Sequence, residues 1–197
     1  MTVDGAGRSK PQVRTRVLHA ALAAVEEVGP DRVRVKDIAD RAGMSSGHVL
    51  YYFGDRDRIL LDTLLLSEAD HADARARLVA RTSDPAEAVD KLCRLYLPTG
   101  ARDVRWALWA QMLARPPEDA PTRRALRDVA DAWAATLAGL LGTLVSDEPG
   151  PAVVAYRQCR LMDGLALEVL LGGPGRARSW AVAEATASWR AMAATGR

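Results

Sequence analysis

Apolar residues recur along the chain at intervals of three and four, and no segment alternates apolar and polar residues with period two. A period near 3.6 is that of an amphipathic α-helix, whereas a half-buried strand requires period two. The first apolar stripe comprises Val13, Val17, Ala21, Ala24 and Val28. The pattern therefore predicts an all-α fold.

Prolines and glycines divide this pattern into segments. Proline fits the first turn of a helix but not its interior, and glycine commonly follows the last turn. Asp55 stands where its side chain can cap the helix that follows. We expect helices over residues 13–28, 35–42, 46–53, 56–81, 85–97, 101–115, 119–145, 151–171 and 176–193.

Residues 35–53 have the spacing of a helix-turn-helix. The positions at which two crossed helices must pack are apolar: Ile38, Ala42, Met44 and Val49. Between the helices, Gly43 permits the left-handed backbone of a tight turn. Ser45 is placed to cap the second helix.

The second helix of this motif presents short polar and aromatic side chains: Ser46, Gly47, His48, Tyr51 and Tyr52. Such groups suit contacts with base edges and phosphates. A basic arm, residues 1–16, precedes it and carries Arg8, Lys10, Arg14 and Arg16 against a single Asp4. A plain helical hairpin without a DNA role is the alternative, and spacing alone does not decide. The arm and the polar helix favour DNA binding.

The segment from Arg14 to Leu66 resembles the DNA-binding domain of the TetR family of bacterial repressors. The residues that carry the resemblance are Ile38-Ala39, Ala42-Gly43, Ser45, Gly47, Phe53 and Arg56-Asp57-Arg58-Ile59-Leu60. Two later segments, Trp106-Ala107-Leu108-Trp109-Ala110 and Met162-Asp163-Gly164-Leu165, resemble the C-terminal domain of the BetI-like subgroup, which includes a repressor of the choline pathway.

This resemblance implies a homodimer with two helical domains. Residues 1–55 are expected to form the arm and the helix-turn-helix domain, and residues 56–197 a helical domain for ligand binding and dimerisation. The implied DNA contacts are Arg34, Lys36, Ser45, Ser46, Gly47, His48, Tyr51, Tyr52 and Arg56. Two residues depart from the family pattern: Leu50 replaces a phosphate-contacting Tyr, and Arg34 replaces a capping Thr or Ser.

Aromatic residues of the second domain suggest a ligand pocket. Trp106, Trp109 and Leu113 share one helical face, Cys93 and Tyr96 lie one helix earlier, and Trp133 lies one helix later. Indole faces bind flat aromatic molecules or cations. Asp163, in an apolar stretch, is a candidate anion for a polyamine or quaternary amine. The alternatives are a core filled with indoles and, for Asp163, a surface or dimer-face position.

The last two predicted helices carry enough apolar residues for a dimer seam. Its candidate residues are Val153, Val154, Leu161, Leu165, Trp180 and Trp189. Packing within one subunit is the alternative. A dimer would bind a pseudo-palindromic operator and be released by a small molecule of unknown identity. An activator, and a helical binding protein that does not read DNA, are the other interpretations.

Composition limits the classes of protein to which the chain can belong. The net charge of +2 excludes a protein that coats polyanions, although it permits a local basic surface. Two cysteines without a CxxC motif indicate reduced thiols rather than a disulfide scaffold or metal site. The sequence shows neither a secretory signal nor an apolar run long enough to span a membrane. We expect a cytoplasmic protein with no catalytic residues and no cofactor or metal.

Overall fold

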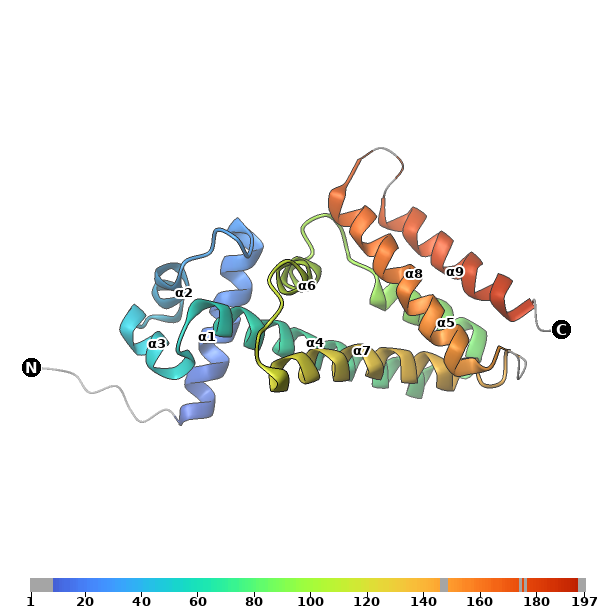
Figure 1. Ribbon diagram of the computed structural model, residues 1–197, viewed down its shortest axis with the longest axis horizontal. Coiled ribbons are helices and arrows are strands. Elements are labelled where there is room, and N and C mark those ends of the chain that lie inside the picture. Colours follow the sequence, from blue (N-terminus) through green and yellow to red (C-terminus); the bar gives the residue numbers. More distant parts are fainter. Residues whose placement is uncertain (1–8, 146–148, 174, 176, 195–197) are drawn as a thin grey trace, which may run out of the picture.

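The computed structural model describes residues 9–145, 149–173, 175 and 177–194. Within these ranges the chain forms helices and no strand (Figure 1). The helices are α1 (Lys10–Val28), α2 (Val35–Ala42), α3 (Ser46–Phe53), α4 (Arg56–Arg81), α5 (Pro85–Tyr96), α6 (Val104–Ala114), α7 (Ala120–Leu141), α8 (Pro151–Leu171) and α9 (Arg178–Ala194). The predicted all-α fold is therefore confirmed.

Aspartate side chains begin four of these helices. Asp55, Asp84, Asp103 and Asp119 each accept a backbone N–H from the first turn of α4, α5, α6 and α7, respectively. These bonds satisfy donors that have no partner within the helix. The Asp119 carboxylate accepts the N–H of Thr122 at 2.8 Å, and this bond lowers the pKa of Asp119 below its usual value.

The first core lies among α1, α2, α3 and the N-terminal half of α4. Ile38, Val49, Ile59 and Leu60 are fully buried in it. Leu108 of α6 also packs there, so α6 joins this core to the remainder of the molecule. Such burial contributes about 1.5–3 kcal/mol for each large side chain.

The second core is a bundle of α5, α7, α8 and α9, with α8 packed between α7 and α9. Leu92, Leu137, Val154 and Met162 are buried at its centre. The long helix α4 runs from the first core to the second (Figure 1). The predicted boundary at residues 55 and 56 remains a prediction, because α4 contributes to both halves.

Three helix ends differ from the sequence prediction by three or four residues, and the others agree to within two. α1 begins at Lys10 rather than Val13, because the Ser9 N–H binds Gln12 Oε1 at 3.1 Å and starts the helix earlier. α6 begins at Val104 rather than 101, after the Asp103 cap. α7 ends at Leu141 rather than 145, and its carbonyl then accepts a turn N–H from Leu144 at 2.8 Å.

None of the helices in the described part of the chain combines the length and apolarity of a membrane span.

Candidate DNA-binding helices and ligand pocket

The turn between α2 and α3 has the geometry that the sequence predicts. Gly43 adopts the left-handed conformation, with φ at 60°, which a side chain would strain. The next residue, Met44, donates its N–H to Ala39 O at 2.9 Å. Ser45 Oγ then accepts the N–H of His48 at 3.2 Å and caps α3.

One face of α3 is buried and the other is presented to solvent. Val49 and Phe53 are buried against the first core. On the other face, His48 is exposed and Tyr51 is 75% exposed. The half-buried Tyr52 ring contacts the rings of both, with centroids 5.3 Å from His48 and 5.4 Å from Tyr51. α3 therefore presents a polar, aromatic face to solvent.

The other residues that the sequence predicts to contact DNA differ in their exposure and in their contacts within the protein. Gly47 and Arg34 are exposed and Ser46 is half-buried. Lys36 is exposed but binds Asp40 at 2.6 Å, and this hydrogen bond raises the pKa of Lys36. These contacts with DNA remain predictions.

Arg56 has a structural role that the sequence did not reveal. Its Nε donates to Val33 O at 2.8 Å, and its Nη2 donates to Pro30 O and to Asp31 O. The guanidinium thus holds the loop between α1 and α2 against the start of α4. Its predicted phosphate contact is untested.

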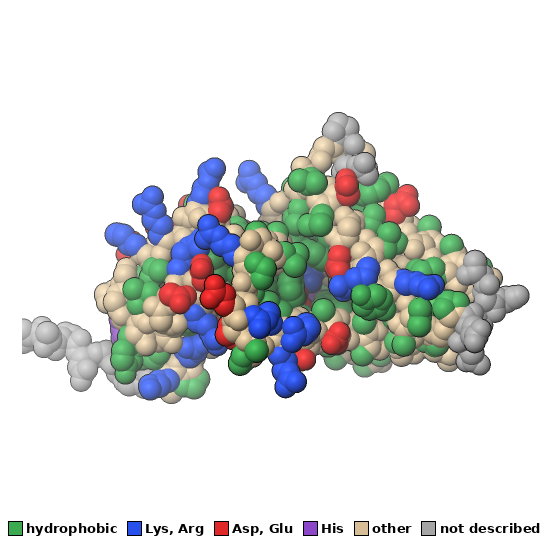
Figure 2. Space-filling model, in the orientation of Figure 1, with side chains coloured by type: hydrophobic (Ala, Val, Ile, Leu, Met, Phe, Trp, Pro, Cys, Tyr) green, Lys and Arg blue, Asp and Glu red, His purple; other side chains and the backbone are tan. Residues whose placement is uncertain are grey.

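The three described cations of the predicted arm, Lys10, Arg14 and Arg16, all belong to α1. Arg14 donates to Tyr52 O at 2.7 Å and stacks on Phe53, with 4.3 Å from Cζ to the ring centroid. Arg16 donates to Gly43 O at 3.3 Å. Residues 1–8, which include Arg8, lie outside the described residues. Figure 2 shows Lys and Arg side chains, interspersed with Asp and Glu, over the end of the molecule built by α1–α3.

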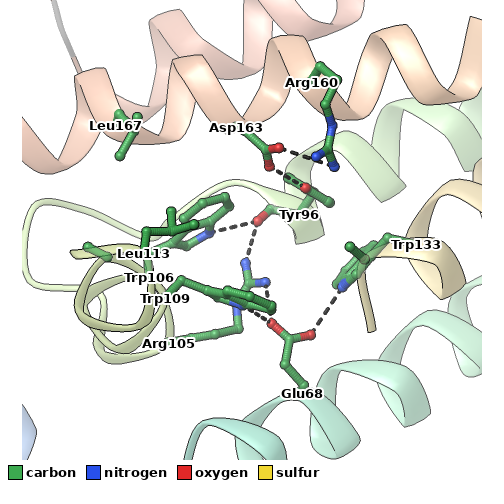
Figure 3. A pocket seen from close by; sticks show the side chains of 12 residues that line it. Glu68, Tyr96, Arg105, Trp106, Trp109, Leu113, Trp133, Arg160, Asp163 and Leu167 are labelled. Atoms are coloured by element: carbon green, nitrogen blue, oxygen red, sulfur yellow. Dashed lines mark hydrogen bonds and ion pairs between the residues drawn. The ribbon is translucent and has the colours of Figure 1, made fainter. Parts of the chain in front are cut away.

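A cavity of about 150 Å³ lies in the C-terminal half, with walls from α4, α5, α6, α7 and α8 (Figure 3). Six residues predicted for a ligand pocket line it: Tyr96, Trp106, Trp109, Leu113, Trp133 and Asp163. The buried rings of Tyr96, Trp106 and Trp133 meet edge to face. Leu113 is exposed at the rim.

The seventh predicted residue, Cys93, does not line this cavity. It is buried in the second core beside Gln158, with 3.9 Å from Sγ to Nε2. Burial raises its pKa to about 12, and burial has the same effect on Cys159. Cys93 lies one turn before Tyr96, but its side chain faces the packed interior of the bundle, so its assignment to the pocket is wrong.

The floor of the cavity is the buried carboxylate of Glu68 on α4. Its Oε1 accepts hydrogen bonds from Trp109 Nε1 at 2.7 Å and Arg105 Nη1 at 3.1 Å. Its Oε2 accepts Trp133 Nε1 at 3.1 Å. Buried carboxylates are tolerated when they are paired and hydrogen-bonded in this way. Glu68 therefore joins α4 to α6 and α7.

A second carboxylate, Asp163 of α8, lies on the other side of the cavity (Figure 3). The Tyr96 hydroxyl donates to its Oδ1 at 2.5 Å, and Arg160 lies 3.2 Å from its Oδ2. Burial raises the pKa of Asp163, although the hydrogen bond from Tyr96 and the charge of Arg160 oppose this shift. Burial and the Asp163 charge together raise the pKa of Tyr96.

The charged pocket residues that the sequence did not predict are Glu68, Arg105 and Arg160. Glu68 and the Tyr96 carbonyl accept the indole N–H groups of the pocket. A signal was present. Glu68 follows Leu61 and Leu64 at helical spacing, so a charge falls on the apolar face of α4. A charge at such a position requires a buried partner.

Three of the residues predicted for a dimer seam lie inside the subunit. Val154, Leu165 and Trp189 are buried in the second core, and Trp189 Nε1 donates to Asp90 Oδ1 at 2.8 Å. Their burial within the subunit contradicts their assignment to a seam. Val153 and Leu161 are exposed, and Trp180 is half-buried.

Two family models match the chain. The model described as bacterial regulatory proteins, tetR family, matches residues 17–63. The model described as BetI-type transcriptional repressor, C-terminal, matches residues 85–189. The first covers α2, α3 and their surroundings, and the second covers most of the helices that line the cavity.

Relatives of known name agree with these matches. The transcriptional regulator BetI of Brucella anthropi is 28% identical over 180 residues, which cover 89% of this chain and 91% of that protein. BetI 2 of Chromohalobacter salexigens is 29% identical over 114 residues, or 54% of this chain and 55% of that protein. The chain thus spans about half the length of the latter relative, and 36% of the BetI protein of Stenotrophomonas maltophilia.

Solved structures share the fold. A transcriptional regulator from Saccharomonospora viridis, crystallised with choline, has a TM-score of 0.77 and 26% identity over 90% of this chain and 95% of that one. A regulator from Rhodococcus sp. RHA1 has a TM-score of 0.74 at 22% identity, over 91% and 95%. Since the C-terminal match spans more than half of the chain, the protein belongs to the TetR family of DNA-binding transcriptional regulators, with a C-terminal domain of the BetI type.

Proposed function

We propose that the protein is a ligand-responsive repressor that binds a pseudo-palindromic operator as a homodimer. The observation that carries this proposal is the face of α3, where His48 and Tyr51 are exposed on a helix fixed by a capped turn. Side chains presented in this way suit base edges in the major groove. The proposal places the protein in the cytoplasm, with the DNA that it regulates.

The surface of α8 and α9 supports the dimer. Large aliphatic side chains outside the cavity lining are exposed along α8: Val153, Leu161 and Leu171. Small exposed residues, Ala183, Ala187 and Ala191, follow one another at four-residue spacing on α9. Figure 2 shows hydrophobic side chains among charged ones over this half of the molecule. An isologous dimer would bury this apolar stripe against its own copy.

The cavity supports a small organic cation as the effector. Its walls combine the rings of Tyr96, Trp106 and Trp109 with the carboxylate of Asp163, a combination suited to quaternary ammonium groups. The Saccharomonospora viridis regulator was crystallised with choline and has the same fold. Choline or a similar quaternary amine is therefore the effector that we propose.

Helix α4 connects the proposed pocket to α3. Glu68 receives bonds from two pocket helices. Six residues earlier, Asp62 pairs with Arg14 of α1, which also donates to Tyr52 O of α3. A ligand that binds better to one position of α4 would shift the spacing of the two recognition helices in the dimer. The ligand can shift the equilibrium between the two states only by the difference in its affinity for them.

The experiment is fluorescence anisotropy of the duplex upstream of the protein's own gene, with scrambled duplex as competitor. We expect specific binding at physiological salt, release by choline, and loss of more than about tenfold in affinity for Tyr51→Ala. Size-exclusion chromatography controls for an intact dimer. Equal binding of scrambled duplex, or an unchanged affinity of the Tyr51→Ala variant, would contradict the assignment of α3.

A further inference from the structure

The cavity contains two ion pairs of different character. Glu68 and Arg105 have side chains that are only 3% and 4% exposed. Glu68 accepts three hydrogen bonds, and Arg105 also donates to the Tyr96 carbonyl. Separating a buried pair of this kind leaves uncompensated charge in the interior. Because both oxygens of the Glu68 carboxylate already accept hydrogen bonds within the protein, Glu68 is unsuitable as the counter-ion of an entering ligand.

The pair formed by Asp163 and Arg160 lies at the mouth of the cavity instead. The Arg160 side chain is 46% exposed, and Asp163 is 35% exposed. Arg160 also lies over the exposed ring of Tyr156, with 5.4 Å from Cζ to the centroid. An exposed pair three residues apart on one helix contributes little free energy. Arg160 can therefore leave Asp163 for solvent at small cost.

The two pairs together leave the four charged lining residues with no net charge. Glu68 and Asp163 supply the negative charges, and Arg105 and Arg160 supply the positive charges. A cation that enters while Arg160 stays on Asp163 meets a compensated carboxylate. If Arg160 leaves, the same carboxylate faces the entering cation, with the rings of Trp106 and Trp109 on the α6 side of the cavity (Figure 3).

We propose that a cationic effector binds by exchange: its ammonium group displaces Arg160 from Asp163 and takes the place of the guanidinium at the carboxylate. Arg160 is then a competitor that sets the affinity and selects for cations, and Asp163 is the residue for which both compete. Tyr96 positions the carboxylate through its hydroxyl. This proposal rests on the proposed function, because it assumes that the cavity takes an organic cation.

The test is a titration of the full-length dimer with choline, followed by tryptophan fluorescence, since three indoles line the cavity. A second probe is the neutral alcohol in which a quaternary carbon replaces the nitrogen of choline. The variants are Arg160→Gln, Asp163→Asn and the double variant. Arg127→Gln is the matched control, because Arg127 is an exposed residue of α7 outside the cavity lining.

We expect Arg160→Gln to tighten choline binding about two- to fivefold, the size of an exposed ion pair, and to leave the neutral probe unchanged. Arg127→Gln should leave both dissociation constants unchanged. Asp163→Asn should weaken choline binding. In the Asp163→Asn background, Arg160→Gln should have no effect, because a double-mutant cycle isolates the contact between the two residues.

Other outcomes separate this proposal from the one on which it rests. Weaker or equal choline binding by Arg160→Gln would overturn exchange. An equal gain in choline affinity from Arg160→Gln in the wild-type and Asp163→Asn backgrounds would also overturn it, because the Arg160 charge would then act only at long range. Equal binding of the neutral probe and choline by the wild-type protein would overturn the cationic effector itself. Failure of the wild-type protein to bind either probe would overturn it as well.

Discussion

Asp62 of α4 forms an ion pair with Arg14 of α1, although the two residues are 48 positions apart in the sequence. Asp62 is 8% exposed and also pairs with Arg58 at 2.9 Å. Six residues later on the same helix, Glu68 binds residues of α6 and α7. α4 thus carries one buried carboxylate directed to the DNA-binding half and another directed to the cavity.

Replacement of Arg14 by Met should loosen the DNA-binding half. The variant loses the bond to Tyr52 O and the ion pair with Asp62, so we expect a decrease of about 1–3 kcal/mol in the free energy of unfolding. Operator affinity should fall with it, while choline affinity is retained. Thermal unfolding, anisotropy and fluorescence titration measure the three quantities. Arg127→Met is the control, and equal stability of the two variants would refute the role of Arg14.

Removal of the Glu68 carboxylate should destabilise the second half. Glu68→Ala leaves Arg105 as a buried charge without its counter-ion and removes the acceptor of Trp109 and Trp133. We expect a loss of about 3–5 kcal/mol, measured by urea unfolding. The double variant Glu68→Leu, Arg105→Met should recover much of this loss, because both charges are then absent. A loss below about 1 kcal/mol for Glu68→Ala would contradict the assignment.

A negative charge on the proposed dimer face should separate the subunits. Ala187→Glu on α9 would place two carboxylates near each other across a two-fold axis and bury them. We expect a monomer by sedimentation and loss of operator binding. Val79→Glu on α4 is the matched control, because Val79 is also an exposed apolar residue but lies outside α8 and α9. A monomeric control, or a dimeric Ala187→Glu variant, would disprove this face.

Choline affinity should depend on pH through Asp163. Burial raises the pKa of this carboxyl, and only its ionised form attracts the cation. Affinity is therefore complete above the raised pKa and falls as pH decreases through it, at a higher pH than for an exposed aspartate. Fluorescence titrations between about pH 4 and pH 7.5 span this range. Asp163→Asn should give weaker, flat binding, and a slope equal to that of the wild-type protein would exclude Asp163.

The sequence predicted local structure best where the signal is itself local. The ranges of α2, α3 and α4 agree with the predicted 35–42, 46–53 and 56–81. Gly43, Ser45 and Asp55 explain this agreement, because a positive φ and two side-chain caps determine these ends within a few residues. The end of α7 carries no such cap, and its prediction was four residues too long.

Contacts between helices were less predictable. Val154 and Val153 are adjacent apolar residues of α8, yet one is buried and the other exposed. The two side chains are identical, so only the rotation of α8 against α7 and α9 distinguishes them. Glu68 and Trp133 are 65 residues apart, and no periodicity within either helix reveals that they meet. The charged floor of the cavity therefore emerged only from the folded arrangement.

The burial of Cys93 and Cys159 has a practical consequence for spectroscopy. Both thiols have pKa values raised to about 12, so they are protonated at neutral pH and enclosed by the bundle. Thiolates rather than thiols react with maleimides and spin-label reagents. A cysteine introduced at the exposed Tyr51 would thus be labelled selectively in the natural background. In a dimer, a pair of such labels would report the separation of the two α3 helices with and without effector.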